Sequence, residues 1–120
     1  MDLENIPTIQ KEELLKLLDS EDVVLLNVLA SNSYEMIHIK NSLSAPYDKL
    51  ENGEFDSIDK NKKLVIYCAS YNCGASRKAA ALMMGRGFEV LAYEGGIKEW
   101  VESGYPTEGR MTPKEYLSSL

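Results

Sequence analysis

The sequence has little of three things: long apolar runs, excess positive charge and cysteine. No apolar run approaches the length of about 18 residues that a membrane-spanning helix needs. Thirteen Lys and Arg residues stand against nineteen Asp and Glu residues, so the net charge is -6. Because phosphate contacts need clustered Lys and Arg, this balance argues against nucleic-acid binding. We therefore expect neither a membrane nor a nucleic acid among the partners.

Two cysteines and one histidine in 120 residues also restrict the chemistry. Two cysteines do not make a disulfide scaffold, and a structural zinc site needs four Cys or His ligands, so we expect no metal. Residues 1–10 carry acidic side chains and lack the apolar stretch of a signal peptide. The length favours a single domain over residues 1–120, and a reducing cytoplasm is the expected compartment.

Short apolar runs of the kind found in buried strands occur twice. Residues 23–28 and 64–67 are rich in β-branched side chains and do not alternate polar with apolar. Such runs are typical of strands that are covered on both faces. Weaker strand candidates are residues 89–93, 6–9 and 43–45.

Between these runs, apolar residues recur at helical spacing. The spacing predicts helices within residues 11–18, 75–83 and 97–101. Thr112 and Glu115 form a capping box with Pro113 at the first helical position, which predicts a terminal helix over residues 113–120. Strand and helix thus alternate along the chain. We predict a three-layer α/β fold, with a mainly parallel sheet of about five strands and helices on both faces.

Cys68 directly follows the second apolar run. Ligands of parallel sheets bind beyond the carboxyl ends of the strands, which is where this residue falls. Small or polar residues follow it, and a helix begins near Ser76. Backbone N–H groups and the positive end of that helix favour a thiolate, so we expect a lowered pKa for the Cys68 thiol. The alternative is an inert thiol that packs as a small apolar side chain.

Several motifs together resemble the rhodanese-like domain family of single-domain sulfurtransferases. Residues 93–100 read YEGGIKEW and residues 104–106 read GYP, which is similar to the C-terminal signature of the family. Tyr34 followed by His38 is similar to a second stretch. The resemblance implies the rhodanese fold and a sulfurtransferase in which Cys68 is the catalytic residue and carries sulfur as a persulfide.

The resemblance also implies the rest of the site. Loop N–H groups would hold the anionic persulfide, and a small sulfur donor or a persulfidated protein would supply the sulfur. No metal or organic cofactor is implied, and the oligomeric state is left open. The loop residues that would bind substrate are Ala69, Ser70, Tyr71, Asn72, Cys73, Gly74, Ala75 and Ser76.

The loop departs from the family pattern in its charge. Family loops commonly carry an arginine directly after the cysteine and a second arginine four residues further on, and these positions are Ala69 and Cys73 here. Arg77 and Lys78, in the start of the next helix, are the candidates for electrostatic support. A dianion such as thiosulfate binds weakly without loop cations, so we expect a persulfide donor. Earlier in the chain, Asn27 stands where the family has Asp.

Cys73 has two interpretations, and they lead to two functions. As a resolving thiol, Cys73 would attack a persulfide or sulfenic acid on Cys68 and close a disulfide. As a packing residue it would only fill space. The alternative to an enzyme is therefore a sulfur or redox sensor, or a protein-interaction module, with a Cys68–Cys73 switch.

Four other residues have simpler interpretations. We interpret His38 as a structural residue whose ring hydrogen-bonds the backbone. Trp100 belongs to the predicted core. Tyr71 and Asn72 lie at the loop tip, where they are either turn residues or contacts to a donor or partner.

Overall fold

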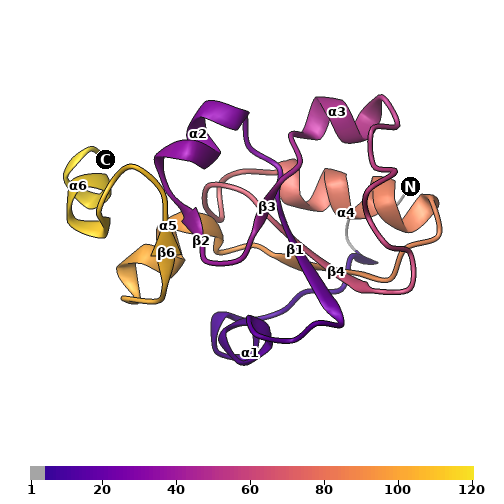
Figure 1. Ribbon diagram of the computed structural model, residues 1–120, viewed down its shortest axis with the longest axis horizontal. Helices are drawn as coiled ribbons and strands as arrows, with labels where there is room; N and C mark the ends of the chain where they lie inside the picture. Colours follow the sequence, from indigo (N-terminus) through magenta and orange to yellow (C-terminus); the bar gives the residue numbers. More distant parts are fainter. Residues whose placement is uncertain (1–4) are drawn as a thin grey trace.

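Four parallel strands lie at the centre of the structure, a computed structural model that describes residues 5–120. Their order across the sheet is β3-β1-β4-β5, and β2 and β6 form a separate antiparallel ribbon (Figure 1). Residues 1–4, part of the predicted domain and of the acidic N-terminal segment, lie outside the described residues. In chain order the elements are α1 (Lys11–Leu17), β1 (Val23–Asn27), α2 (Ser31–Met36), β2 (His38–Ile39), β3 (Leu43–Ser44), α3 (Tyr47–Glu51), β4 (Lys63–Tyr67), α4 (Ala75–Gly85), β5 (Val90–Tyr93), α5 (Gly96–Glu102), β6 (Thr107–Glu108) and α6 (Pro113–Ser118).

The central strand β4 confirms the prediction from its apolar run. It pairs in parallel with β1 on one side and β5 on the other, and it is buried from Leu64 to Tyr67. The sheet has four strands where about five were expected. Residues 6–9 contribute a single parallel bridge, from Thr8 to Ala92. Pro7 has no N–H to donate, so the ladder cannot continue through it.

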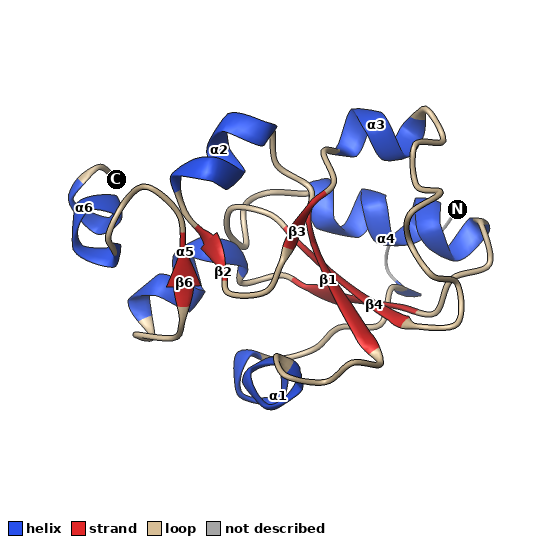
Figure 2. Ribbon diagram, viewed as in Figure 1, coloured by secondary structure: helices blue, strands red, loops and turns tan. Residues whose placement is uncertain are grey.

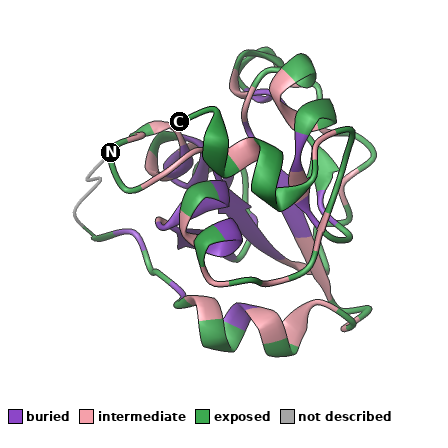
Figure 3. Ribbon diagram, turned by 90° about the vertical axis from the view of Figure 1, so that its left-hand side faces the viewer, coloured by how far each residue is buried: buried purple, intermediate pink, exposed green. Residues whose placement is uncertain are grey.

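Helices cover both faces of the sheet, as predicted (Figure 2). Side chains of β4 and the next residue alternate between the faces. Leu64, Ile66 and Cys68 pack with α3 and α4, whereas Val65 and Tyr67 pack with α1 and α5. The strands are therefore buried between helices whose outer sides are exposed (Figure 3). Tyr67 and Cys68, which are adjacent at the end of β4, therefore pack against different helices on opposite faces of the sheet.

Four short elements, α2, α3, β2 and β6, carry too little apolar pattern to be predicted from the sequence. Helix α2 has no fully buried residue, and α3 buries only Leu50. The strands β2 and β6 have two residues each, and they pair segments far apart in the chain. Periodicity needs a longer buried stripe than any of these elements offers.

The C-terminal helix α6 confirms the capping box. The Thr112 hydroxyl accepts from the Glu115 N–H at 3.1 Å, and the Glu115 carboxylate accepts from the Thr112 N–H at 2.9 Å. The longest helix of the described chain, α4, has 11 residues. Within residues 5–120, no helix has the length and apolar character needed to cross a bilayer.

Candidate active site

Cys68 lies directly beyond the carboxyl end of β4, as expected. Its side chain belongs to the apolar cluster formed with α3 and α4, and the residue is 0% exposed. The thiol donates to the backbone carbonyl of Cys73, with 3.3 Å between Sγ and oxygen. The loop thus folds back over the sulfur and closes the site from solvent.

The loop is a tight turn whose tip faces solvent. The Cys73 N–H donates to the Ser70 carbonyl at 3.0 Å, and the Asn72 N–H donates to the Ser70 hydroxyl at 3.3 Å. Tyr71 and Asn72 are exposed at the tip, whereas Cys73 is half-buried. Gly74 precedes α4 and Ala75 begins it. Of the predicted loop residues, Cys73 and Ser76 contact the Cys68 sulfur, whereas Tyr71 and Asn72 lie at the exposed tip.

The EGG turn explains why the C-terminal motif accompanies the cysteine. Helix α5 begins at Gly96, and its first N–H groups reach the Cys68 loop. The Ile97 N–H donates to the Cys68 carbonyl at 3.0 Å, and the Lys98 N–H donates to the Ala69 carbonyl at 2.9 Å. Gly96 has a φ of 67°, and a Cβ there would lie 2.6 Å from the Cys68 oxygen. Only glycine lets α5 approach the loop this closely.

The expected lowering of the Cys68 pKa is wrong. Burial, and after it the contact with Cys73, raises the pKa of this thiol to about 11. The hydroxyl and N–H of Ser76 oppose the rise without overcoming it. For Cys73, burial also opposes ionisation, but hydrogen bonds from Cys68 and from the N–H groups of Ala69 and Ala75 lower its pKa. The loop amides that were expected to favour a Cys68 thiolate favour one on Cys73.

Ser76 lies in the first turn of α4 with its hydroxyl against the Cys68 sulfur. Its oxygen is buried and has no hydrogen-bond partner among residues 5–120. The Cys68 thiol donates its proton to the Cys73 carbonyl, and its neutral sulfur is only a weak acceptor for the Ser76 hydroxyl. Once Cys68 loses that proton, the anionic sulfur becomes a strong acceptor for the hydroxyl. The hydroxyl is therefore placed to stabilise the anionic sulfur.

Of the two candidates for electrostatic support, Arg77 is engaged by a carboxylate. Its Nε donates to Glu94 Oε2 at 2.9 Å and its Nη2 donates to Glu94 Oε1 at 3.1 Å. Lys78 is exposed. Glu94 comes from the EGG turn, and its part in the site was not predicted. The spacing of 17 residues gives no local signal for this pair.

A second carboxylate holds the loop tip. Glu99 accepts from the Tyr71 hydroxyl at 3.0 Å and from the Tyr93 hydroxyl at 2.7 Å. The hydrogen bond to Glu99 raises the pKa of Tyr71, and burial followed by this bond raises the pKa of Tyr93. A hollow of about 130 Å³ lies here, lined by Ser70, Tyr71, Asn72, Gly95, Lys98, Glu99 and Glu102. The loop tip is therefore predominantly acidic.

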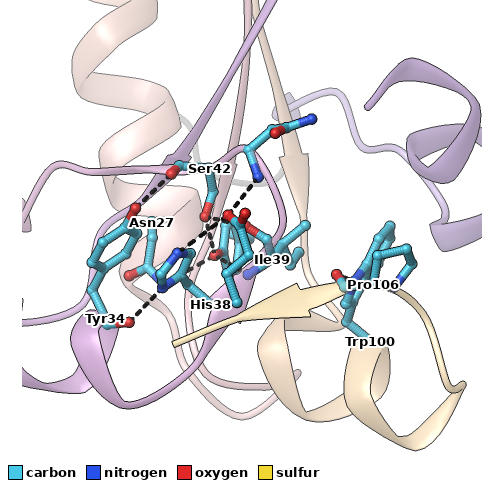
Figure 4. A network of polar contacts seen from close by, with 10 residues as sticks. Asn27, Tyr34, His38, Ile39, Ser42, Trp100 and Pro106 are labelled. Carbon is cyan, nitrogen blue, oxygen red and sulfur yellow. Dashed lines mark hydrogen bonds and ion pairs between the residues drawn. The ribbon is translucent and has the colours of Figure 1, made fainter. Parts of the chain in front are cut away.

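On the opposite face of the sheet, Tyr67 anchors a buried polar network. Its partners Asn27, Ile39 and Ser42 are labelled in Figure 4. Its hydroxyl accepts from the Asn27 amide and from the Ile39 N–H, both at 3.0 Å. It lies 2.8 Å from the Ser42 hydroxyl, which donates to the Ile39 carbonyl at 2.7 Å. Burial raises the pKa of Tyr67 to about 12. This network was not predicted, although a Tyr inside an aliphatic run was a signal for it.

His38 is structural, as interpreted from the sequence. Its Nδ1 lies 2.7 Å from the Tyr34 carbonyl, and its ring stacks on Tyr34 at a centroid distance of 3.8 Å. Trp100 is fully buried and donates to the Pro106 carbonyl at 2.7 Å (Figure 4). Among residues 5–120, no cluster of His, Cys, Asp and Glu has the composition of a metal site.

Comparisons with known proteins agree with this geometry. The sequence model of the rhodanese-like domain matches residues 10–103. The chain is 32% identical over 96 residues to the thiosulfate sulfurtransferase GlpE of Coxiella burnetii, which covers 79% of this chain and 86% of that protein. It is 30% identical over 114 residues to the thiosulfate:glutathione sulfurtransferase of Saccharomyces cerevisiae, which covers 83% of this chain and 81% of that protein.

The fold has a close counterpart among solved structures. The BH2092 protein from Bacillus halodurans superposes with a TM-score of 0.82 at 25% identity, covering 88% of this chain and 79% of that chain. The motifs, the fold and the sequence match over residues 10–103 lead to the same conclusion. The chain belongs to the rhodanese-like domain family.

Proposed function

We propose that this chain is a sulfurtransferase that carries sulfane sulfur as a persulfide on Cys68. One observation carries the proposal: the loop and the first turn of α4 fold around a single sulfur at the carboxyl end of β4. The names of the relatives from Coxiella burnetii and Saccharomyces cerevisiae support the same kind of reaction.

In this reaction the Cys68 thiolate attacks the outer sulfur of a donor. The S–S bond of the donor breaks, the donor leaves as a thiolate and takes up a proton, and Cys68 keeps the outer sulfur as a persulfide. An acceptor nucleophile then removes that sulfur. The reaction needs no cofactor, because one sulfur atom moves between thiols. The thiols have to stay reduced between turnovers, which fits the cytoplasm that we propose as the compartment.

The charges around the loop favour a persulfide as the donor over thiosulfate. Glu94 holds the Arg77 guanidinium, and the hollow at the loop tip is lined by two carboxylates, Glu99 and Glu102, against one cation, Lys98. Thiosulfate carries two negative charges and needs cations that bind it directly. A low-molecular-weight or protein persulfide carries at most one negative charge on its reacting sulfur. We therefore propose a persulfide donor.

Intact mass spectrometry tests this function. The reduced protein is incubated separately with thiosulfate and with glutathione persulfide, beside the Cys68→Ser and Cys73→Ser variants. We expect wild type to gain the mass of one sulfur atom from glutathione persulfide faster than from thiosulfate. The wild-type peptide that contains residues 64–77 should carry this sulfur on Cys68. A folded, reduced wild type that gains no sulfur from either donor would rule out the sulfurtransferase.

A second candidate function, a sulfur or redox sensor, is favoured by the contact between the two cysteine side chains. Oxidation by diamide would remove two hydrogen atoms from the thiols of Cys68 and Cys73 and join them as a disulfide. A mass loss of two hydrogen atoms, reversed by dithiothreitol and absent in Cys73→Ser, would support the sensor. An unchanged mass would count against it.

A further inference from the structure

The two cysteines of the site differ in their access to solvent. Cys68 is 0% exposed, and the backbone of Cys73 closes over its sulfur. Cys73 is half-buried and lies just inside the exposed loop tip formed by Tyr71 and Asn72. A donor that arrives from solvent therefore meets the Cys73 thiol before it can reach Cys68.

The polar groups of the loop also shift the pKa values of the two thiols differently. Burial opposes ionisation of Cys73, but the nearby Cys68 thiol and the N–H groups of Ala69 and Ala75 lower its pKa. Cys68 is neutral and directs its proton toward Cys73. The outer thiol thus lies in the amide-lined part of the loop, whereas the inner thiol keeps its proton and donates it to the Cys73 backbone carbonyl.

We propose that sulfur enters the site through Cys73 and passes from there to Cys68. The inference rests on the proposed function, in which Cys68 is the final carrier. It assigns Cys73 a step that neither a packing residue nor a resolving thiol performs. The Cys73 thiol becomes the first covalent acceptor, and no movement that exposes Cys68 to the donor is required.

In the first step the Cys73 thiolate attacks the outer sulfur of a persulfide donor. A bond forms between Cys73 Sγ and that sulfur, the S–S bond of the donor breaks, and the donor thiolate leaves with a proton from water. Because the thiolate is the nucleophile in this exchange, the half-exposed, amide-bound Cys73 suits the step.

In the second step Cys68 takes the outer sulfur from Cys73. The new bond forms at Cys68 Sγ, the S–S bond at Cys73 breaks, and the proton of the Cys68 thiol moves to the Cys73 side. A thiol of lower pKa leaves faster, and a thiolate of higher pKa is the stronger nucleophile. The amides that lower the pKa of Cys73 make it a good leaving group, and Cys68 lies next to it because its thiol contacts the Cys73 backbone, so the sulfur can pass inward. No oxidant or reductant is consumed.

Rapid-quench loading with glutathione persulfide tests the relay. Wild type, Cys68→Ser and Cys73→Ser are mixed with the donor, quenched with iodoacetamide and digested with trypsin. Both cysteines fall in one peptide, residues 64–77, so fragmentation of that peptide locates the added sulfur. Cys68→Ala serves as a second variant, because a serine hydroxyl in the apolar site could disturb folding. Circular dichroism confirms that each variant is folded.

We expect Cys68→Ser and Cys68→Ala to accumulate one sulfur on Cys73 and to keep it there, because the second acceptor is missing. We expect Cys73→Ser to load Cys68 at least about tenfold more slowly, because the donor must wait for the loop to open. In wild type the sulfur should appear on Cys73 first and on Cys68 later.

Three results would overturn the relay. In the first, Cys73→Ser loads Cys68 at the wild-type rate. In the second, neither Cys68 variant carries sulfur on Cys73. In the third, wild type releases sulfide and forms a disulfide. In the first two cases wild type still gains sulfur on Cys68, so the proposed function survives. Only a wild type that never carries sulfur on Cys68 contradicts the sulfurtransferase itself.

Discussion

Tyr67 and Cys68 are neighbours in the chain, yet their side chains enter opposite faces of the sheet and opposite kinds of surroundings. The Tyr67 hydroxyl is fully engaged by Asn27, Ile39 and Ser42. On the other face, Cys68 makes a long contact to a carbonyl, and a buried Ser76 hydroxyl beside it has no partner in the described chain.

The comparison separates the Tyr67 face, which stabilises the fold, from the Cys68 face, where we propose that the reaction takes place. Buried polar groups are normally hydrogen-bonded, and the Tyr67 face follows this rule in the resting state. On the Cys68 face the hydroxyl gains its partner only when the sulfur becomes an anion. A group that is unsatisfied before the reaction and satisfied during it stabilises the charged state selectively.

The largest loss of unfolding free energy is expected from Gly96→Ala, because α5 begins at Gly96 and packs there against the backbone of Cys68 and Ala69. The substitution places a Cβ 2.6 Å from the Cys68 oxygen and 2.6 Å from the Ala69 carbonyl carbon, at a φ of 67°. Steric overlap and backbone strain together should cost about 4 kcal/mol of unfolding free energy. Urea denaturation measures the loss, and sulfur loading should fall with it.

Gly104→Ala is the matched control for that substitution. Gly104 has a φ of 74°, and a Cβ there meets nothing within 4 Å. The backbone strain is retained without the collision, so the cost should be about 1 kcal/mol. Equal losses in the two variants would show that α5 does not press on the Cys68 loop.

Tyr67→Phe should lower the unfolding free energy through the Tyr67 face of the sheet and leave sulfur loading on the Cys68 face unchanged. Removing the hydroxyl leaves the Asn27 amide and the Ile39 N–H as buried donors without an acceptor. The expected loss is about 2–3 kcal/mol of unfolding free energy, with sulfur loading retained below the melting transition. Tyr71→Phe, which removes an exposed hydroxyl bonded to Glu99, should cost less than about 0.5 kcal/mol. A loss of loading in Tyr67→Phe at unchanged stability would contradict the division between the faces.

Ser76→Ala and Ser42→Ala sharpen the comparison, since both serines are buried. Ser76→Ala should change stability by less than about 0.5 kcal/mol, because its hydroxyl has no resting partner. It should slow iodoacetamide alkylation of Cys68 about tenfold and move the pH profile upward, since a hydrogen bond to the anion is lost.

Ser42→Ala should lower stability and leave Cys68 alkylation unchanged, the reverse of Ser76→Ala. It removes the hydroxyl that links Tyr67 to the Ile39 carbonyl, so it should cost about 1–3 kcal/mol while Cys68 alkylation keeps its pH profile. Both alkylation series use the Cys73→Ser background, in which Cys68 is the remaining cysteine. Equal alkylation profiles for Ser76→Ala and its parent would remove Ser76 from the chemistry.

The unfolding free energy should also depend on pH through the two thiols. The Cys68 thiol has a pKa of about 11 in the fold against 9.0 in the unfolded chain, so between these limits the unfolded chain binds fewer protons. Stability from this group is present below pH 9 and is lost as the pH rises toward 11. The lowered pKa of Cys73 acts in the opposite sense, adding stability as the pH rises toward 9.

Urea titrations of wild type and Cys68→Ser from pH 8 upward check this sign. We expect the difference in unfolding free energy between the two proteins to shrink across that alkaline window. Tyr67, whose pKa rises from 10.0 to about 12, loses stability in the same way in both proteins and therefore cancels. Parallel curves would contradict the raised pKa of Cys68.

The parts of the fold that bury a long apolar pattern could be predicted from the sequence. The run at β4 and the spacing of Ile97 and Trp100 in α5 are of this kind, and α6 was predicted from its capping box. The ribbon of β2 and β6 could not be predicted, because each strand has two residues and finds its partner through the tertiary fold.

The position of the candidate site was predictable, but its electrostatics were not. A cysteine after a buried strand and before a helix identified Cys68. Its pKa depends on how far the loop folds over it, and local sequence does not give that burial. The Arg77–Glu94 pair likewise depends on how β5 and α4 are placed side by side. Local pattern therefore predicted where the candidate site lies but gave the wrong direction for the pKa shift of its thiol.

The edges of the main sheet have a consequence for aggregation. An uncovered edge strand offers free N–H and C=O groups on which another chain can extend the sheet. Here β3 contributes only Leu43 and Ser44 to one edge, and residues 7–9 cover part of the other edge by bonding to Ala92. Neither edge gives an incoming strand a long template, so the native protein should resist fibril growth at concentrations where a protein with an open sheet edge would assemble.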